Sequence, residues 1–383
     1  MRIAFYAPMK APDYPTQSGD RRIARLILAA LRATGHEVHL ASHFRSRDGA
    51  GDGRRQERIR DLGKRLADRL LRRYRAAPAD LRPELWFTYH VYHKAPDWLG
   101  PPVAKALGIP YVLAEASFAP KQAGGRWSAG HDAAGEAIAA AAAVFNLNPG
   151  DVDCVKPLLE SPQRLVPLKP FIDTAEYSSP LAAVGTREML AKRYRLPAAD
   201  TWLMVVAMMR AGNKRDSYQL LAEALATLQA RSWCLVIVGD GPRRAEVEDM
   251  FAAFAPGRIV FTGALAGDPL RALMAHCDLF VWPGVREPIG MAMLEAQAAG
   301  LPVVTGHGPG IANIVRDGCT GRLVPRGDVG AFAGAVAGLI DAPQTRADLG
   351  SRARRRAVEY HDIATAGATL DRVLTGLKAG SWP

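Results

Sequence analysis

The sequence predicts an α/β protein of two domains, each built on a parallel β-sheet covered by helices. Apolar runs of strand length alternate with stretches of helix length along the chain, which is typical of successive βαβ units. The chain has 383 residues, more than a single hydrophobic core usually serves. No apolar run approaches the ~20 residues that a membrane-spanning helix needs. We therefore expect two globular domains.

Charge and cysteine usage narrow the classes of partner. The formal net charge of +11 favours a polyanion, which could be nucleic acid, an anionic membrane surface or a phosphorylated substrate. No nucleic-acid-binding module is recognisable, so we expect no nucleic-acid partner. The four cysteines show no metal or redox spacing, which predicts reduced thiols and a cytoplasmic protein without a bound metal. The first seven residues indicate a strand rather than a signal peptide.

The first half of the chain places polar residues where strands end. We predict strands over residues 2–7, 38–41, 85–89, 109–113 and 144–147, and helices over residues 20–34, 54–74 and 133–144. Ligands of open α/β sheets bind at the carboxyl ends of the strands. His90 and Lys94 follow one strand, Glu115 follows the next, and Gly19 ends the loop 8–18. The position of His90 and Lys94 makes them candidate contacts for a substrate.

The segment 54–75 is the most basic part of the chain and has two interpretations. Its apolar stripe is formed by Ile59, Leu62, Leu66, Leu70 and Tyr74. Arginines and Lys64 cover much of the remaining surface. Such a stripe usually packs on a domain core. The basic face also fits peripheral contact with an anionic membrane, which would place a cytoplasmic protein at the inner face of the membrane.

The second half repeats the alternation after a proline-containing segment, 166–173, that we interpret as the linker between domains. Strands are predicted over residues 202–208, 234–238, 259–261, 279–282 and 301–305, and helices over 187–194, 332–339, 345–359 and 361–377. The sequence Gly-x-Gly-x-x-Gly is absent, which argues against a dinucleotide oxidoreductase.

The stretch 287–305 carries the most specific chemistry. Pro288 fits a first helical turn, and Gly300 fits the end of the helix. The N–H groups of Ile289, Gly290 and Met291 would then lie at a helix N-terminus, which favours phosphate binding. Glu287 and Glu295 are eight residues apart, about 12 Å along a helix axis. A diphosphate flanked by two sugars has that reach; in the alternative, Glu287 only caps the helix and Glu295 is solvated.

Glu287-Pro-x-Gly-x-x-x-x-Glu295-Ala, followed by Ala-Gly300-Leu-Pro-Val-Val, resembles the two-glutamate signature of the retaining group 1 glycosyltransferases (glycosyltransferase family 4). The resemblance covers about residues 205–341. It implies the GT-B fold, in which two Rossmann-like domains face each other across a cleft. Residues 1–173 would bind the acceptor, residues 174–360 the nucleotide sugar, and the helix within 361–383 would return to the first domain.

The resemblance also implies roles for single residues. Arg210 and Lys214, or Arg215 in place of Lys214, correspond to the clamp on the diphosphate. Glu287 would hold the transferred sugar and Glu295 the ribose. Gly239 and Gly241 would form the turn near the nucleotide, with Ala264 and Leu265 against the base. The donor would be a UDP-, GDP- or ADP-linked hexose, with no metal or other cofactor; no Asp-x-Asp metal motif stands in a suitable place.

One position departs from the family pattern. Many members carry a histidine after the strand that ends near residue 113, where this chain has Glu115. Glu115 could take over that role or bind acceptor hydroxyls. The resemblance also implies that Gly19 is the loop glycine that lets the acceptor or a phosphate approach the helix N-terminus. Two rival functions stay open: a GT-B nucleotide-sugar epimerase or hydrolase, and a sugar-nucleotide-binding protein without catalysis.

Overall fold

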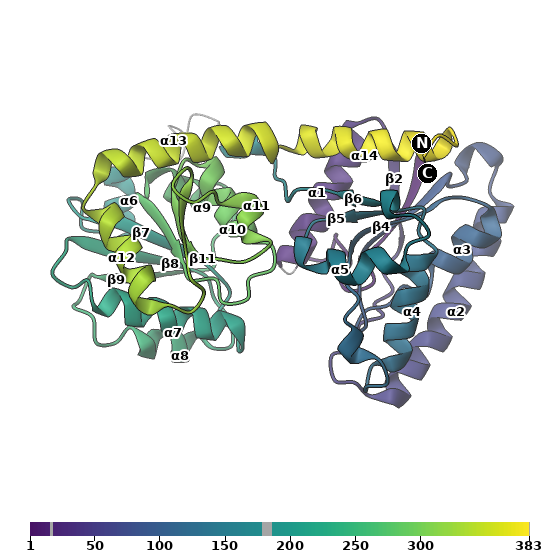
Figure 1. Cartoon of the computed structure of the whole chain (residues 1–383), viewed down its shortest axis with the longest axis horizontal. Helices are drawn as coiled ribbons and strands as arrows, with labels where there is room; N and C mark the ends of the chain where they lie inside the picture. Colours follow the sequence, from purple (N-terminus) through teal and green to yellow (C-terminus); the bar gives the residue numbers. More distant parts are fainter. Residues whose placement is uncertain (16–17, 178–185, 383) are drawn as a thin grey trace. The chain divides into compact units, whose positions relative to one another are not determined.

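The computed structural model describes residues 1–15, 18–177 and 186–382, which form two compact units (Figure 1). Unit 1 comprises Met1–Lys169 and Ile363–Pro383, and unit 2 comprises Pro170–Asp362. The chain thus passes between units after residue 169 and after residue 362, beside the expected boundaries at 173 and 360. Residues 16 and 17 of the expected loop 8–18 lie outside the described residues.

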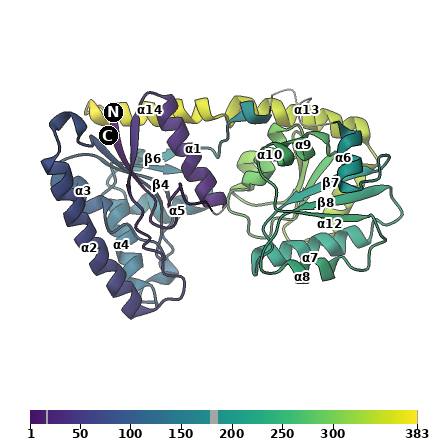
Figure 2. The ribbon, with the colours of Figure 1, turned by 180° about the vertical axis from the view of Figure 1, so that it is seen from behind.

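Unit 1 contains a parallel six-stranded sheet in the order β2-β1-β3-β4-β5-β6. Its strands are β1 (Arg2–Tyr6), β2 (Glu37–Ser42), β3 (Leu85–Val91), β4 (Tyr111–Ala116), β5 (Ala143–Asn146) and β6 (Leu165–Pro167). Its helices are α1 (Gly19–Ala33), α2 (Gly53–Ala76), α3 (Gly100–Leu107), α4 (Ser128–Ala139), α5 (Val152–Val155) and α14 (Ile363–Lys378). The last helix packs against α1, as both views show (Figures 1 and 2).

The prediction of a linker from residue 166 onward is wrong at its start. Leu165–Pro167 forms β6, which pairs with β5 at the edge of the sheet. An edge strand tolerates proline because one side of its backbone has no partner strand. The two prolines therefore misled the sequence interpretation.

Unit 2 contains a second parallel six-stranded sheet, in the order β12-β11-β10-β7-β8-β9. Its strands are β7 (Thr201–Val206), β8 (Trp233–Val238), β9 (Ile259–Gly263), β10 (Leu279–Trp282), β11 (Val303–Gly306) and β12 (Gly321–Val324). Its helices are α6 (Arg187–Tyr194), α7 (Asn213–Ala226), α8 (Arg244–Met250), α9 (Asp268–His276), α10 (Met291–Ala298), α11 (Ile311–Ile314), α12 (Val329–Ile340) and α13 (Pro343–Tyr360). The two sheets confirm the predicted α/β class.

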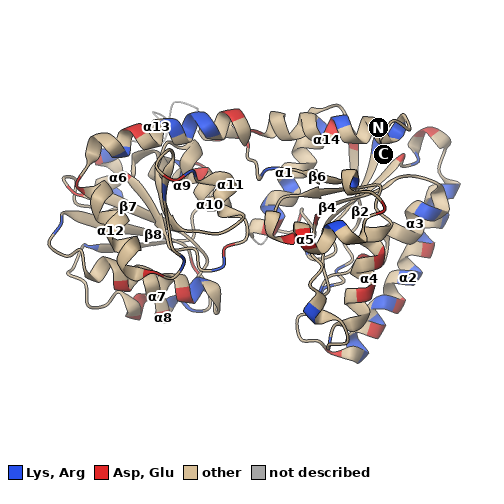
Figure 3. Cartoon of the chain, in the orientation of Figure 1, with Lys and Arg blue, Asp and Glu red and all other residues tan. Residues whose placement is uncertain are grey.

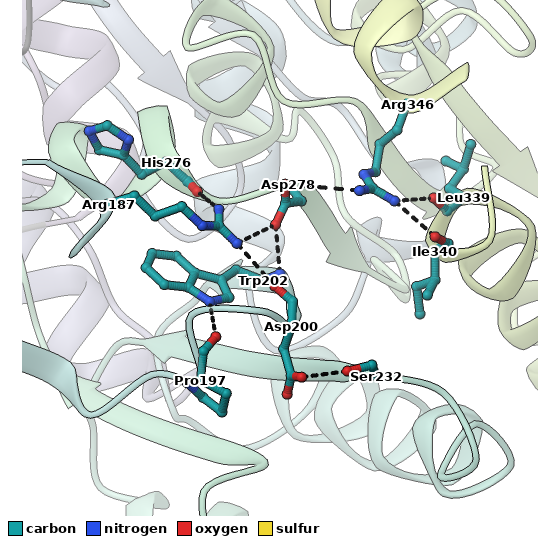
Figure 4. A network of polar contacts seen from close by, with 10 residues as sticks. All are labelled: Arg187, Pro197, Asp200, Trp202, Ser232, His276, Asp278, Leu339, Ile340 and Arg346. Atoms are coloured by element: carbon teal, nitrogen blue, oxygen red, sulfur yellow. Dashed lines mark hydrogen bonds and ion pairs between the residues drawn. The ribbon is translucent and has the colours of Figure 1, made fainter. Parts of the chain in front are cut away.

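A polar network ties the amino ends of two strands of unit 2 to helices α6 and α13 (Figure 4). Arg187 donates to the carboxylate of Asp278 at 3.0 Å and to the carbonyl oxygen of Asp200 at 3.0 Å. The same Asp278 oxygen accepts the backbone N–H of Trp202 at 2.8 Å, and Arg346 lies 4.0 Å from the other oxygen. The network fixes the edge of the sheet opposite to the carboxyl ends of the strands.

Helix α2 packs against α3, and its residues Gly63, Ala67, Leu70 and Tyr74 are buried. Part of the expected apolar stripe thus serves the core of unit 1, whereas Leu62 is exposed. Positive and negative residues both colour this helix in Figure 3. Among the described residues, no helix combines the length and the apolar character required to traverse a bilayer.

Candidate active site

The carboxyl ends of β7 and β10 bring two loops of unit 2 together. These strands are neighbours, with Leu203 opposite Leu279, and the order of the sheet reverses its direction between them. The loop 207–212 follows β7 and leads into α7, and the loop 283–290 follows β10 and leads into α10. In open α/β sheets the crevice for a ligand lies at such a switch point.

Helix α10 begins later than predicted. The sequence placed Pro288 in its first turn, but the helix starts at Met291, because Gly290 has a φ of +84° and interrupts the helical backbone. The N–H groups of Met293 and Leu294 both donate to the carbonyl of Gly290. The amides of Met291 and Ala292 therefore open the helix, whereas those of Ile289 and Gly290 belong to the preceding loop.

Lys214 and Glu287 form an ion pair although they are 73 positions apart in the sequence. Lys214 lies in the first turn of α7, and Glu287 lies in the loop after β10. Both side chains are mostly buried, at 21% and 17% exposed, so solvent screens the pair less than a surface pair. The structure thus brings two predicted site residues into direct contact.

The other two cations of the predicted clamp lie differently. Arg215 points to the Glu246 carboxylate, with its Nε 2.8 Å from one oxygen. Arg210 is exposed in the loop between β7 and α7. Of the two alternatives for the second clamp residue, Lys214 is therefore the one that reaches Glu287.

Gly239 and Gly241 have no room for a side chain. A Cβ atom on Gly239 would lie 1.9 Å from the carbonyl oxygen of Ala207, and one on Gly241 would lie 2.2 Å from that of Met209. The backbones are also joined by the hydrogen bond from the Met209 N–H to the Asp240 carbonyl, at 3.0 Å. The turn after β8 thus lies directly on the loop that carries Arg210.

The remaining residues that are predicted to bind the donor sugar nucleotide also lie in unit 2. Glu295 lies on α10 and is only 6% exposed, which excludes the alternative of a solvated side chain. Ala264 and Leu265 follow β9, where Ala264 is exposed and Leu265 is half-buried.

In unit 1, two candidate residues lie inside strands rather than in the predicted loops. His90 belongs to β3 and Glu115 to β4, and both have left-handed backbones, with φ of +65° and +58°. Such conformations cost on the order of 1–3 kcal/mol outside glycine and concentrate at functional sites. In the pairing of β3 with β4, Tyr89 lies opposite Ala114 and Val91 lies opposite Ala116. His90 and Glu115 lie between these two pairs, so the two left-handed residues are adjacent.

Electrostatic contacts surround these residues. The His90 ring nitrogen Nδ1 lies 3.0 Å from one oxygen of Asp20, and Lys10 lies 2.8 Å from the other. Burial lowers the pKa of His90, but the hydrogen bond to Asp20 and the negative charges of Asp20 and Glu115 together outweigh burial and raise the pKa. His90 and Lys10 likewise hold the pKa of Asp20 below its ordinary range in spite of burial. Burial raises the pKa of Glu115 to about 7.

The last two candidates of unit 1 have less specific surroundings. The Lys94 ammonium lies 4.3 Å from the centre of the Trp127 ring. Gly19 opens α1 after the capping Ser18, and nothing lies within 4 Å of a Cβ built on it. A Cβ atom at position 19 would therefore meet no atom of the described residues within 4 Å.

Three residues that the sequence did not indicate complete the Lys214–Glu287 region. The Trp282 indole N–H lies 3.4 Å from a Glu287 carboxylate oxygen, the Ser217 hydroxyl accepts the N–H of Val285, and the Tyr218 ring packs on Trp282. Their only sequence signal is position: Trp282 ends a strand, and Ser217 follows Lys214 by three residues, on the same helix face.

Residues 200–342 match the family model of the group 1 glycosyl transferases. The sulfoquinovosyl transferase SQD2 of Arabidopsis thaliana is 34% identical over 161 residues, which cover 41% of this chain and 30% of that protein. A GDP-mannose-dependent phosphatidylinositol monomannoside mannosyltransferase of Mycolicibacterium smegmatis is 32% identical over 55% of this chain and 56% of its own length. The 2-deoxystreptamine glucosyltransferase of Streptomyces kanamyceticus is 29% identical over 72% of this chain and 74% of its own.

The chain therefore spans about a third to just over half of the first two of these relatives. Among solved structures, Anabaena HepE in complex with UDP has a TM-score of 0.74 at 18% identity, covering 98% of this chain and all of that one. The glycosyltransferase WaaG has a TM-score of 0.68 at 17% identity, with coverage of 98% and 100%. These likenesses show a common fold.

Proposed function

We propose that this chain, whose residues 200–342 match the group 1 glycosyl transferases and which has the GT-B fold, is a retaining glycosyltransferase. It would move a hexose from a nucleoside-diphosphate sugar to an acceptor. The observation that carries the proposal is the Lys214–Glu287 pair at the switch point of the unit 2 sheet. One cation for a phosphate and one carboxylate for sugar hydroxyls are the two groups that this donor requires.

Catalysis would rest on stabilising the diphosphate that leaves. Lys214 and Arg210 supply positive charge, and the amides of Met291 and Ala292 add the partial charge of a helix N-terminus. Donors fixed in this way stabilise charge that develops in the transition state without reorganising. Two cations and a helix end can neutralise the leaving group, so we propose a reaction that needs no metal.

The other residues of unit 2 would orient the donor. Glu287 would bind hydroxyls of the transferred sugar, and Glu295 those of the ribose. The close contact of Gly239 and Gly241 with the loop 207–212 leaves backbone, rather than side chains, to face the nucleotide. Ala264 and Leu265 would line the base.

Unit 1 would bind the acceptor at its own switch point, between β1 and β3. His90 and Glu115 would contact hydroxyls there, with Gly19 and Lys94 at the edge. The acceptor is a glycan, a lipid or a small molecule. The names of relatives include a lipid-linked acceptor and an aminocyclitol, 2-deoxystreptamine.

Contact of residues 54–75 with an anionic membrane is a separate proposal. The outward arginines of α2 favour it, whereas Glu57, Asp61 and Asp68 on the same helix oppose it. Co-sedimentation with phosphatidylcholine vesicles, with and without phosphatidylglycerol, tests it. Binding that needs phosphatidylglycerol and is lost when Arg58, Arg65 and Arg72 become glutamine supports the proposal, and unchanged binding contradicts it.

A panel of UDP-, GDP- and ADP-sugars tests the proposed function through thermal stability. A ligand that binds only the folded protein stabilises it by about 2.7 kcal/mol at a hundredfold excess over its Kd. We expect sugar nucleotides with one of these three bases to raise the melting temperature. We expect the matching donor to be consumed only when an acceptor is present. Turnover without acceptor would favour the epimerase or hydrolase, and binding without any product would favour a non-catalytic protein.

A further inference from the structure

We infer that Trp282 and Ser217 are positioning residues that fix Lys214 and Glu287 relative to each other. The inference rests on the proposed function, in which Lys214 binds the diphosphate and Glu287 the transferred sugar. Lys214 comes from helix α7 and Glu287 from the loop after β10, so their mutual geometry depends on what joins these two elements. Trp282 joins the side chains, and Ser217 joins the backbones.

Trp282 contacts both members of the pair. Its indole N–H lies 3.4 Å from the same Glu287 oxygen that pairs with Lys214, and the Lys214 ammonium lies 5.2 Å from its ring centre. A cation within about 6 Å of an indole face is attracted by the ring. The side chain is 2% exposed, so its N–H needs a partner within the protein. Trp282 therefore restrains the carboxylate with its edge and the ammonium with its face.

Ser217 connects the helix that carries Lys214 to the loop that carries Glu287. Its hydroxyl accepts the N–H of Val285 at 3.0 Å and donates to the carbonyl of Asn213 at 2.7 Å. The residue is 1% exposed, so removal of the hydroxyl would leave the Val285 N–H without this partner in a buried place. Two residues later, the N–H of Glu287 bonds to the carbonyl of Gly284. The turn 284–287 therefore connects Glu287 to the hydrogen bond between Val285 and Ser217.

Tyr218 holds the indole in place from the next position of the helix. Its ring meets Trp282 edge-on, with centroids 5.0 Å apart and planes at 75°. Its hydroxyl donates to the carbonyl of Ala207 at 2.8 Å, the same oxygen against which Gly239 packs. Tyr218 thus packs against the indole while its own hydroxyl is bonded to the loop after β7.

This arrangement predicts that loss of the positioning residues affects the binding of the two parts of the donor differently. Loss of the indole N–H removes one of the two contacts that hold the Glu287 oxygen, whereas Lys214 keeps its place on α7. Contacts to the transferred sugar should weaken while contacts to the diphosphate persist. A change confined to protein stability would weaken both equally.

The experiment compares Trp282→Phe and Ser217→Ala with wild type in the full chain. Calorimetric titration uses the nucleoside diphosphate and the nucleotide sugar whose base the thermal panel identifies. For both variants we expect affinity for the diphosphate within about twofold of wild type, and turnover of the sugar donor lower by about 10- to 100-fold, as for a reacting group misplaced by about 1 Å.

Trp233→Phe is the matched control. Trp233 is fully buried in the same sheet and its N–H donates to the carbonyl of Leu228 at 2.8 Å, away from the pair. It should lower stability and leave the ratio of the two affinities unchanged. The inference is overturned if Trp282→Phe and Ser217→Ala keep wild-type affinities and turnover. It is also overturned if both variants lose affinity for the diphosphate and for the nucleotide sugar in the same ratio as Trp233→Phe. If wild type binds no nucleotide, the proposed function fails first and this inference fails with it.

Discussion

At the scale of single residues, the chemistry depends on charges held in partly buried places. Lys214 and Glu287 neutralise each other at a site that is mostly shielded from water. Glu115 in unit 1 is buried and accepts the N–H of Leu147 at 3.3 Å. The two carboxyl groups therefore answer differently to mutation and to pH.

Glu287→Ala should abolish most transfer. The variant loses the proposed contact to the sugar and leaves Lys214 without its carboxylate, so we expect turnover to fall by about 100-fold or more. Glu246→Ala, which removes the surface partner of Arg215, should stay close to wild type. Initial rates with saturating donor check both. Full turnover by Glu287→Ala would contradict the assignment.

Glu115 should make stability depend on pH. Because its pKa is raised from 4.5 to about 7 in the folded protein, its contribution is present below pH 4.5 and is lost as pH rises through 7. The change is on the order of 3 kcal/mol at 1.36 kcal/mol per pH unit. The pKa of the neighbouring His90 is also raised, so its contribution to stability is likewise lost as pH rises. The pKa of Asp20 is lowered, so Asp20 changes the stability only below its ordinary pKa of 3.8. Asp151 is a further charged neighbour of Glu115, and Lys10 is a charged neighbour of His90.

Urea unfolding of wild type and Glu115→Gln from pH 4.5 to 8 measures this contribution. The glutamine variant cannot ionise, so its free energy of unfolding should fall less over this range. The difference between the two curves isolates Glu115 from His90. Parallel curves would show that Glu115 does not titrate in this window.

The residues of the site were only partly predictable from the sequence. Glu287 and Lys214 stand in a recognisable pattern, and the structure brings them together. Trp282 and Ser217 carry no pattern of their own, because their partners are distant in sequence and only packing reveals them. A tryptophan at a strand end reads as core, and this one is also core.

At the scale of elements, the ends of strands decide where the site lies. The close approach of the turn after β8 to the loop after β7 requires glycine at two positions. Helix α10 was predicted from its propensities, yet its start was misplaced because Pro288 is equally acceptable in a loop. His90 and Glu115 were read as loop residues because a left-handed residue inside a strand leaves no sequence signal unless it is glycine.

Gly239→Ala should disrupt the carboxyl edge of the unit 2 sheet. Its Cβ would lie 1.9 Å from the Ala207 carbonyl, so one of the two backbones must move. We expect a loss of several kcal/mol in the free energy of unfolding, roughly 3 or more, with weaker nucleotide binding. Gly334→Ala in α12 meets no atom within 4 Å and should gain up to about 1 kcal/mol in helix propensity. Chemical denaturation compares them; equal stabilities would contradict the packing argument.

At the scale of the whole molecule, two sheets of similar design would each serve one of the two proposed substrates. Each sheet has one point at which its strand order reverses, between β1 and β3 in unit 1 and between β7 and β10 in unit 2. The alternation of strands and helices predicted this class of fold, since each element recurs with its own period. The sequence could not show that Leu165–Pro167 forms the edge strand of the first sheet, because three residues are too few for a recognisable strand pattern.

The most direct test of the account is a crystal structure of the protein soaked with the nucleotide sugar that the thermal panel selects. We predict the diphosphate in contact with the Lys214 ammonium and the Met291 amide, with Glu287 bonded to hydroxyls of the transferred sugar. A diphosphate bound elsewhere in unit 2, or in unit 1, would contradict the proposed donor site.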